Sequence, residues 1–152
     1  MNYSYIDLFC GAGGLSVGFD RAGFQNVFSV EFNPKFAKTY ERNFPSHKLL
    51  IEDIRDISNE RVKELIGDKE IDIIIGGPPC QGFSIAGNIG RTFIDDERNR
   101  LFKEFVRFVN EIKPKMFIME NVAAMATHLK GKTINAIVNA FEHAGIGYKV
   151  KW

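Results

Sequence analysis

The alternation of short apolar runs with amphipathic segments restricts this chain to a narrow set of folds. The apolar runs predict β-strands at residues 4–9, 26–32, 48–51, 71–76, 115–120 and 147–152. Helices are predicted between them, up to residue 22, over 34–43 and 59–66, after residue 100 and over 134–141. Strands that alternate with helices form a mainly parallel, doubly wound sheet with right-handed crossovers. Residues 71–76 are apolar on both faces, which predicts an inner strand.

The size and charge of the chain favour one ordinary domain. Its 152 residues suit a single unit, which we expect to span residues 1–152. It has 20 Lys and Arg against 19 Asp and Glu, so charge alone does not indicate a nucleic-acid-binding protein. No apolar run has the length of a membrane span, and no signal peptide opens the chain. We therefore expect a cytoplasmic protein with no membrane association.

The cysteines and histidines do not suggest a metal site. Cys10 and Cys80 belong to no CxxC pair, and the three histidines are scattered. Neither residue type shows the spacing of metal ligands, so we expect no metal.

Polar or glycine-rich features follow most of the predicted strands. In open α/β sheets, ligands bind beyond the carboxyl ends of the strands. The sequence therefore predicts a site at one edge of the sheet, built from five features: the glycine-rich turn after Phe9, Glu31, Asp53, Cys80 and Glu120.

The first half of this edge has the pattern of a nucleoside site. The turn in "DLFCGAGGLSVGF" has the spacing GxGG and not GxGxxG, which suits an adenosine ligand without a pyrophosphate at least as well as a dinucleotide. Glu31 follows Asp7 by about two dozen positions, where a carboxylate accepts hydrogen bonds from ribose hydroxyls. Phe32 is placed either to pack on an adenine face or to join the core. Asp53 is placed either to accept from the amino group of adenine or to serve as a turn residue.

The second half of the edge has the pattern of a nucleophile with an acid. Pro78 and Pro79 fix two φ angles directly before Cys80. We expect a thiol in this polar and glycine-rich segment to be exposed and not buried, so we interpret Cys80 as a nucleophile. A nucleophilic cysteine needs an acid or base, and Glu120 at the end of an apolar strand is the best candidate. Asn121 follows it and is placed to hold backbone near the Cys80 turn.

Six motifs in this order make the chain resemble the DNA (cytosine-5) methyltransferases, in the amino-terminal part of their catalytic domain. The motifs are "DLFCGAGG", "VEFNP", Asp53-Ile54, "GGPPCQGFS", "DERNRLF" and "MENV". The resemblance implies the Rossmann-like fold of S-adenosylmethionine-dependent methyltransferases, incomplete at the C-terminus.

The resemblance also implies S-adenosylmethionine as the cofactor, with S-adenosylhomocysteine as its product. The implied cofactor-binding residues are Phe9, Gly11, Ala12, Gly13, Gly14, Leu15, Glu31, Phe32, Asp53, Ile54, Gly77, Pro79 and Leu101.

The implied reaction is methylation of carbon 5 of cytosine in duplex DNA. Cys80 would attack carbon 6 of a flipped base, while Glu120 stabilises the ring and Asn121 supports the site. Residues 84–100 would close over that base. The implied nucleic-acid contacts are Gln81, Ser84 and Arg98.

The resemblance stops before the family's QxRxR segment, target-recognition domain and C-terminal motifs. We therefore expect the chain to act with a complementary chain, or with the rest of its polypeptide, and to be inactive alone. Restriction-modification and regulation both stay open as roles. Two other readings also remain: cytosine-5 methylation of transfer RNA, and a noncatalytic cofactor-binding or interaction module.

Overall fold

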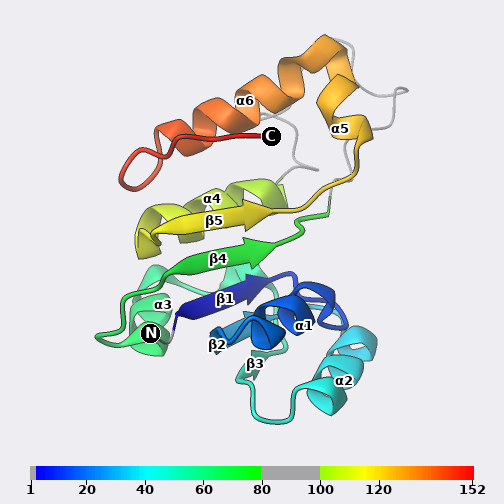
Figure 1. Ribbon diagram of the computed structural model, residues 1–152, viewed down its shortest axis with the longest axis vertical. Helices are drawn as coiled ribbons and strands as arrows, with labels where there is room; N and C mark the ends of the chain where they lie inside the picture. The colour runs from blue at the N-terminus through cyan, green and yellow to red at the C-terminus, as the bar shows by residue number, and fades with distance from the viewer. Residues whose placement is uncertain (1–2, 80–99) are drawn as a thin grey trace.

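The computed structural model describes residues 3–79 and 100–152 and contains a parallel sheet flanked by helices (Figure 1). The strands are β1 (Ser4–Leu8), β2 (Gln25–Val30), β3 (Leu49–Leu50), β4 (Ile73–Gly76) and β5 (Met116–Met119). They lie in the order β3-β2-β1-β4-β5, and every neighbouring pair is parallel. The predicted α/β class is therefore confirmed, and β4 is an inner strand as its apolar faces indicate.

The described helices are α1 (Gly14–Arg21), α2 (Pro34–Asn43), η1 (Ile54–Asp56), α3 (Asn59–Ile66), α4 (Arg100–Ile112), α5 (Ala124–Thr127), η4 (His128–Gly131) and α6 (Lys132–Glu142). The longer helices begin and end close to where the sequence predicts, whereas the short η1, α5 and η4 are not predicted from the sequence. Asn33 caps α2 by accepting a hydrogen bond from the Lys35 amide, and Pro34 occupies the first turn. In the described ranges, no helix combines the length and the apolar character needed to cross a membrane.

The strands are shorter than their apolar runs. β1 ends at Leu8 because Phe9 has a φ of 62°, a left-handed conformation that a strand does not contain. This turn carries the chain from the sheet into the glycine-rich loop before α1.

The predicted sixth strand is wrong. Residues 147–152 form no strand, although "GYKVKW" alternates as a strand does. Tyr148 instead turns back onto the end of α4: its hydroxyl donates to the Pro114 carbonyl at 2.7 Å, and its ring lies edge-on to Phe117 at 5.2 Å. Within the described residues, β5 pairs with β4 alone.

The two faces of the sheet differ in chemistry. α1 lies in front of the sheet in Figure 1, and α3 and α4 lie behind it. On the α3/α4 face, Ile6 and Leu8 pack in an apolar core with Phe105 and Phe108 of α4, all fully buried. On the α1 face, Asp7 is fully buried beside a polar cluster.

This polar cluster is centred on the hydroxyl of Tyr40. The hydroxyl lies 2.9 Å from Ser16 Oγ, 2.7 Å from Ser29 Oγ and 3.0 Å from His47 Nδ1. Ser16 in turn donates to Asp7 Oδ2 at 2.7 Å. The cluster therefore ties β1, β2, α1 and α2 together beneath the glycine-rich loop.

Burial makes the Asp7 carboxyl a poor acid. Its Oδ1 atom is buried and has no hydrogen-bond partner. Desolvation, reinforced by the nearby Glu31, raises the pKa of Asp7 from its ordinary 3.8 to about 7, although the bond from Ser16 opposes the shift. The folded chain thus binds a proton here more tightly than the unfolded chain does.

We expect the Asp7→Asn variant to lose most of the pH dependence of stability that this carboxyl causes. The Asp7 contribution is full below pH 3.8 and is lost as pH rises through about 7, because the folded-state pKa is raised. In the native chain, this contribution to the free energy of unfolding should fall by roughly 2–3 kcal/mol between about pH 5 and pH 9. Urea unfolding at several pH values measures it. A variant that keeps the same pH slope as the native chain would contradict the assignment.

Candidate functional site

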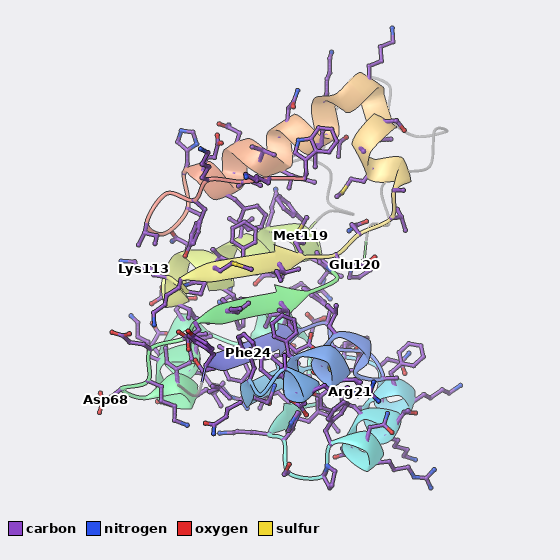
Figure 2. All side chains as sticks on the ribbon, viewed as in Figure 1. Arg21, Phe24, Asp68, Lys113, Met119 and Glu120 are labelled. Carbon is purple, nitrogen blue, oxygen red and sulfur yellow. The ribbon has the colours of Figure 1, made fainter. Side chains whose placement is uncertain are left out.

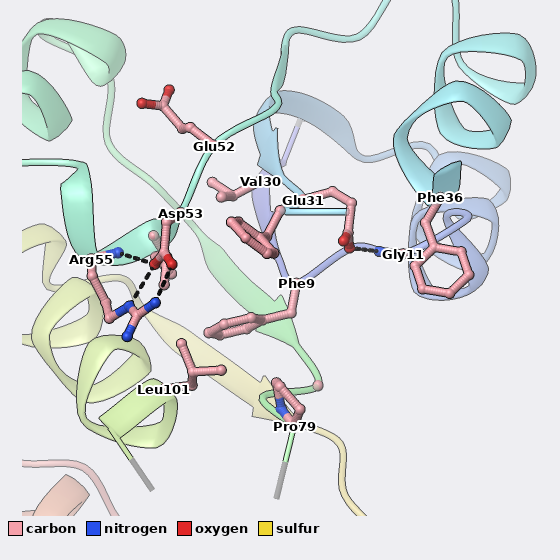
Figure 3. A pocket seen from close by; sticks show the side chains of 13 residues that line it. Phe9, Gly11, Val30, Glu31, Phe36, Glu52, Asp53, Arg55, Pro79 and Leu101 are labelled. Atoms are coloured by element: carbon pink, nitrogen blue, oxygen red, sulfur yellow. Dashed lines mark hydrogen bonds and ion pairs between the residues drawn. The ribbon is translucent and has the colours of Figure 1, made fainter. Parts of the chain in front are cut away.

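A cavity of about 490 Å³ opens at the carboxyl ends of the strands (Figure 3). Its lining comes from the end of β2 and from the segments after β1, β2, β3 and β4, with single residues from α2 and α4. The lining residues are Phe9, Gly11, Val30, Glu31, Phe32, Phe36, Glu52, Asp53, Ile54, Arg55, Gly77, Pro79 and Leu101. A volume of this size is typical of small-ligand sites.

Most of the predicted cofactor residues meet at this cavity. Ala12, Gly13, Gly14 and Leu15 follow Gly11 in the chain and do not line it. Gly13 has a packing role instead: its φ is 96°, and a Cβ there would come within 2.1 Å of the Phe44 ring. Any part these four residues play in binding remains a prediction.

Glu31 joins two of the segments that line the cavity. Its Oε2 accepts a hydrogen bond from the Gly11 amide at 2.9 Å, and its Oε1 accepts one from the Asn33 amide at 2.6 Å. The side chain is nearly buried, with 9% of its surface exposed. Each oxygen has a further lone pair, so the carboxylate can also accept from hydroxyl groups of a ligand.

Asp53 and Arg55 lie together at the other end of the cavity (Figure 3). The Arg55 side chain binds both oxygens of the Asp53 carboxylate. Those hydrogen bonds are the main reason that the pKa of Asp53 is lowered from 3.8, so this group is ionised at neutral pH.

Aromatic and aliphatic side chains form the rest of the wall. Phe32 and Phe36 are largely exposed at 69% and 53%, whereas Ile54 is buried. An exposed aromatic ring beside a cavity offers a flat apolar surface to a ligand. The cavity therefore combines apolar walls with three carboxylates, those of Glu31, Glu52 and Asp53.

The end of β4 and the turn after it lie close against neighbouring segments. A Cβ at Gly76 would lie 2.1 Å from the Leu8 carbonyl oxygen, and a Cβ at Gly77 would lie 3.0 Å from Glu120 Oε2. The Glu120 carboxylate thus lies directly against the turn that leads to position 80. Figure 2 shows Glu120 at the carboxyl end of β5.

Asn121 fixes the same turn from the β5 side. Its Nδ2 donates to the Pro78 carbonyl at 3.0 Å, and its Oδ1 accepts from the Val122 amide at 2.8 Å. Glu120 and Asn121 are the two residues predicted to act together with Cys80. Both therefore contact the segment that precedes Cys80.

The remaining predicted site residues lie outside the described part of the chain. These are Cys80, Gln81, Ser84 and Arg98, together with the predicted closing segment up to residue 99. The other cysteine, Cys10, is buried, and burial raises the pKa of its thiol. In the residues that the structure describes, no group of His, Cys, Asp and Glu could hold a metal ion.

The comparison with known protein families decides the identity of this fold. Residues 3–152 match the C-5 cytosine-specific DNA methylase family. The chain belongs to this family.

Relatives within the DNA methylase family include bacterial Type II methyltransferases. The chain is 55% identical over 151 residues to Type II methyltransferase M1.HphI of Haemophilus parahaemolyticus, which covers 99% of this chain and 40% of that protein. It is 41% identical over 155 residues to Type II methyltransferase M.AquIA of Picosynechococcus sp., which covers 98% of this chain and 62% of that protein.

A solved structure agrees with the family and the fold. The crystal structure of a candidate DNA modification methyltransferase encoded within an E. coli prophage has a TM-score of 0.75 and 38% identity. The match covers 91% of this chain and 37% of that one. The chain thus spans less than two thirds of the length of these relatives. The predicted Rossmann-like methyltransferase fold is confirmed.

Sequence reasoning missed some residues of this DNA methylase cavity. They are Val30, Phe36, Glu52 and Arg55. Val30 and Glu52 adjoin predicted site residues, and position alone could have suggested them. Arg55 likewise adjoins the predicted Ile54. Phe36 gave no such signal, because an aromatic residue on a helix is common on any surface.

We expect Asn121→Ala to lower the free energy of unfolding by about 1–2 kcal/mol, because it removes the partner of the Pro78 carbonyl. Urea unfolding monitored by circular dichroism measures the change. Asn135→Ala is the matched control, since Asn135 is exposed on α6. Equal stability of the two variants would show that the Pro78 contact contributes nothing.

Proposed function

We propose that the chain carries the cofactor-binding and catalytic core of a DNA (cytosine-5) methyltransferase. It transfers a methyl group from S-adenosylmethionine to carbon 5 of cytosine in duplex DNA. The observation that carries the proposal is the cavity itself: in a member of the DNA methylase family, it presents Glu31 and Asp53 at separate ends of an apolar wall.

The residues around the cavity fit an adenosine-containing cofactor. Glu31 can accept from both ribose hydroxyls, and Asp53 can accept from the exocyclic amine of adenine. Phe32 and Ile54 would lie against the adenine, and Phe9, Pro79 and Leu101 would enclose the remainder. The glycine-rich turn, with Ala12, Gly13, Gly14 and Leu15, would approach the methionine part. When bound, S-adenosylmethionine supplies the methyl group from its sulfonium.

The protein's own groups would make cytosine reactive. Carbon 5 is too weak a nucleophile to accept a methyl group unaided. The Cys80 thiolate would add to carbon 6 and shift electron density to carbon 5. Glu120 would hydrogen-bond the ring nitrogen and the exocyclic amine, which stabilises the charge that develops. Carbon 5 would then take the methyl group, which leaves S-adenosylhomocysteine as the product. Loss of the carbon 5 proton to a base or water, followed by β-elimination, would release Cys80.

The bonds around the β4 turn support this assignment. Asn121 holds the Pro78 carbonyl, and the Glu120 carboxylate lies against Gly77. A nucleophile at position 80 would therefore start from an anchored turn next to its acid. The target base would have to leave the double helix, at a cost of a few kcal/mol. Gln81, Ser84 and Arg98 would contact the nucleic acid.

We further propose that activity requires the part of the family that this chain does not match. The chain spans 40% of M1.HphI, and its charges are nearly balanced, so most of the DNA-contacting surface would lie in that other part. A complementary chain, or the rest of the polypeptide, would supply target recognition. The exposed Met116 and Ile118 of β5 suit such an association. The bacterial Type II relatives support a role in restriction-modification, and we propose that this role is carried out in the cytoplasm.

We expect S-adenosylhomocysteine to bind the chain, and Glu31→Ala to weaken that binding by about 10- to 100-fold, because a charged hydrogen-bond acceptor is lost. Isothermal titration calorimetry measures both affinities. Glu64→Ala is the matched control, since Glu64 is exposed on α3 away from the cavity lining. Absence of binding by the native chain would refute the proposed cofactor.

We expect a chimera, with this chain in place of the matching part of M1.HphI, to form a covalent adduct with duplex DNA that M1.HphI methylates. In this DNA the target cytosine is replaced by 5-fluorocytosine. The fluorine at carbon 5 blocks the elimination step and traps the adduct in the presence of S-adenosylmethionine. Denaturing gel electrophoresis detects it. Cys80→Ala should abolish the adduct, while Cys10→Ala should keep it because Cys10 is buried. A folded chimera that binds this DNA without an adduct would favour a noncatalytic module.

A further inference from the structure

Arg55 makes a two-point contact with a carboxylate that lines the cavity. Its Nε donates to Asp53 Oδ1 at 2.9 Å, and its Nη2 donates to Oδ2. The backbone amide of Arg55 also donates to Oδ1, at 2.9 Å. This fork is the geometry in which a guanidinium fixes the plane of a carboxylate, and a lysine cannot reproduce it.

The contact leaves Asp53 with limited capacity for a ligand. A carboxylate has about four acceptor positions, two on each oxygen. Arg55 fills both positions on Oδ1 and one on Oδ2. The position left on Oδ2 can accept one N–H or O–H group, and an ionised carboxylate donates nothing in return.

The turn that carries this pair is anchored to α4. Arg107 donates from Nη2 to the Ile54 carbonyl at 3.0 Å and from Nη1 to Asn59 Oδ1 at 2.6 Å. The Ile54 side chain is buried in the apolar core. The backbone of Asp53 and Arg55 is therefore fixed, and the orientation of the Asp53 carboxylate depends on the Arg55 fork.

The two side chains differ in exposure. The Arg55 side chain is 51% exposed and the Asp53 side chain 12%. Arg55 thus covers the carboxylate from the solvent side, and both residues line the cavity.

We propose that Arg55 is a positioning residue, which holds Asp53 so that this end of the cavity selects an adenine with its exocyclic amine. The inference rests on the proposed function, because it takes the ligand to be S-adenosylmethionine or its product. Arg55 contributes specificity for the amine and not general affinity for the nucleoside.

The test compares two ligands in the native full chain and in Arg55→Lys and Arg55→Gln. One ligand is S-adenosylhomocysteine, and the other is the analogue in which hydrogen replaces the exocyclic amine. Isothermal titration calorimetry gives the affinity ratio of the two ligands in each protein. Lys63→Gln is the matched control: it removes one cation and its ion pair with Glu111 on a surface away from the cavity lining.

In the native chain and in Lys63→Gln, the amine should improve affinity by about 10- to 100-fold. In both Arg55 variants, this ratio should fall below about 3-fold, with the affinity for the analogue nearly unchanged. A ratio that persists in the variants, or an equal loss of affinity for both ligands, overturns the positioning role. A ratio near one in a native chain that binds both ligands also overturns it, while the proposed cofactor stands. No binding of either ligand to the native chain refutes the proposed cofactor, and this inference with it.

Discussion

The buried carboxylate of Glu31 is the interaction on which the arrangement of the site depends. It accepts hydrogen bonds from the amides of Gly11 and Asn33, so the loop after β1 and the start of α2 are held by one side chain. Parallel strands bring their carboxyl ends to one edge of the sheet, but they do not fix the loops that follow. Glu31 provides that fixation between β1 and β2, and Asn121 provides it between β4 and β5 through the Pro78 carbonyl. Glu31 lines the cavity, and so do Gly77 and Pro79 on either side of the carbonyl that Asn121 holds.

Much of the fold could be predicted because its signals are local. The cap and first turn of α2 follow from Asn33 and Pro34, and α3 (Asn59–Ile66) occupies its predicted residues. The alternating pattern of residues 147–152 could not decide whether they form a sixth strand. Alternation shows that a segment has one polar and one apolar face, but not whether a partner strand lies beside it. In the structure, the Tyr148 hydroxyl donates a hydrogen bond to the Pro114 carbonyl, just after α4.

The site was predictable where residues follow strand ends, and less so where contacts join distant segments. Glu31, Asp53 and Glu120 each end or follow an apolar run, and the order of a parallel sheet brings the first two to one cavity. The link between Asn59 and Arg107 spans 48 positions and leaves no trace in the local sequence. The contact between Arg55 and Asp53 could not be predicted either. Two residues that are two positions apart can form such a contact, but the spacing does not require it.

The hydroxyl of Tyr40 is shared by residues from α1, β2 and the segment after α2. A group with that many partners cannot lose one without disturbing the geometry of the others. Transient opening of the region below the glycine-rich loop should therefore be all-or-none, with these elements exchanging their amide protons in concert. The support beneath the glycine-rich loop should then keep a single shape for as long as this shared hydroxyl keeps its partners.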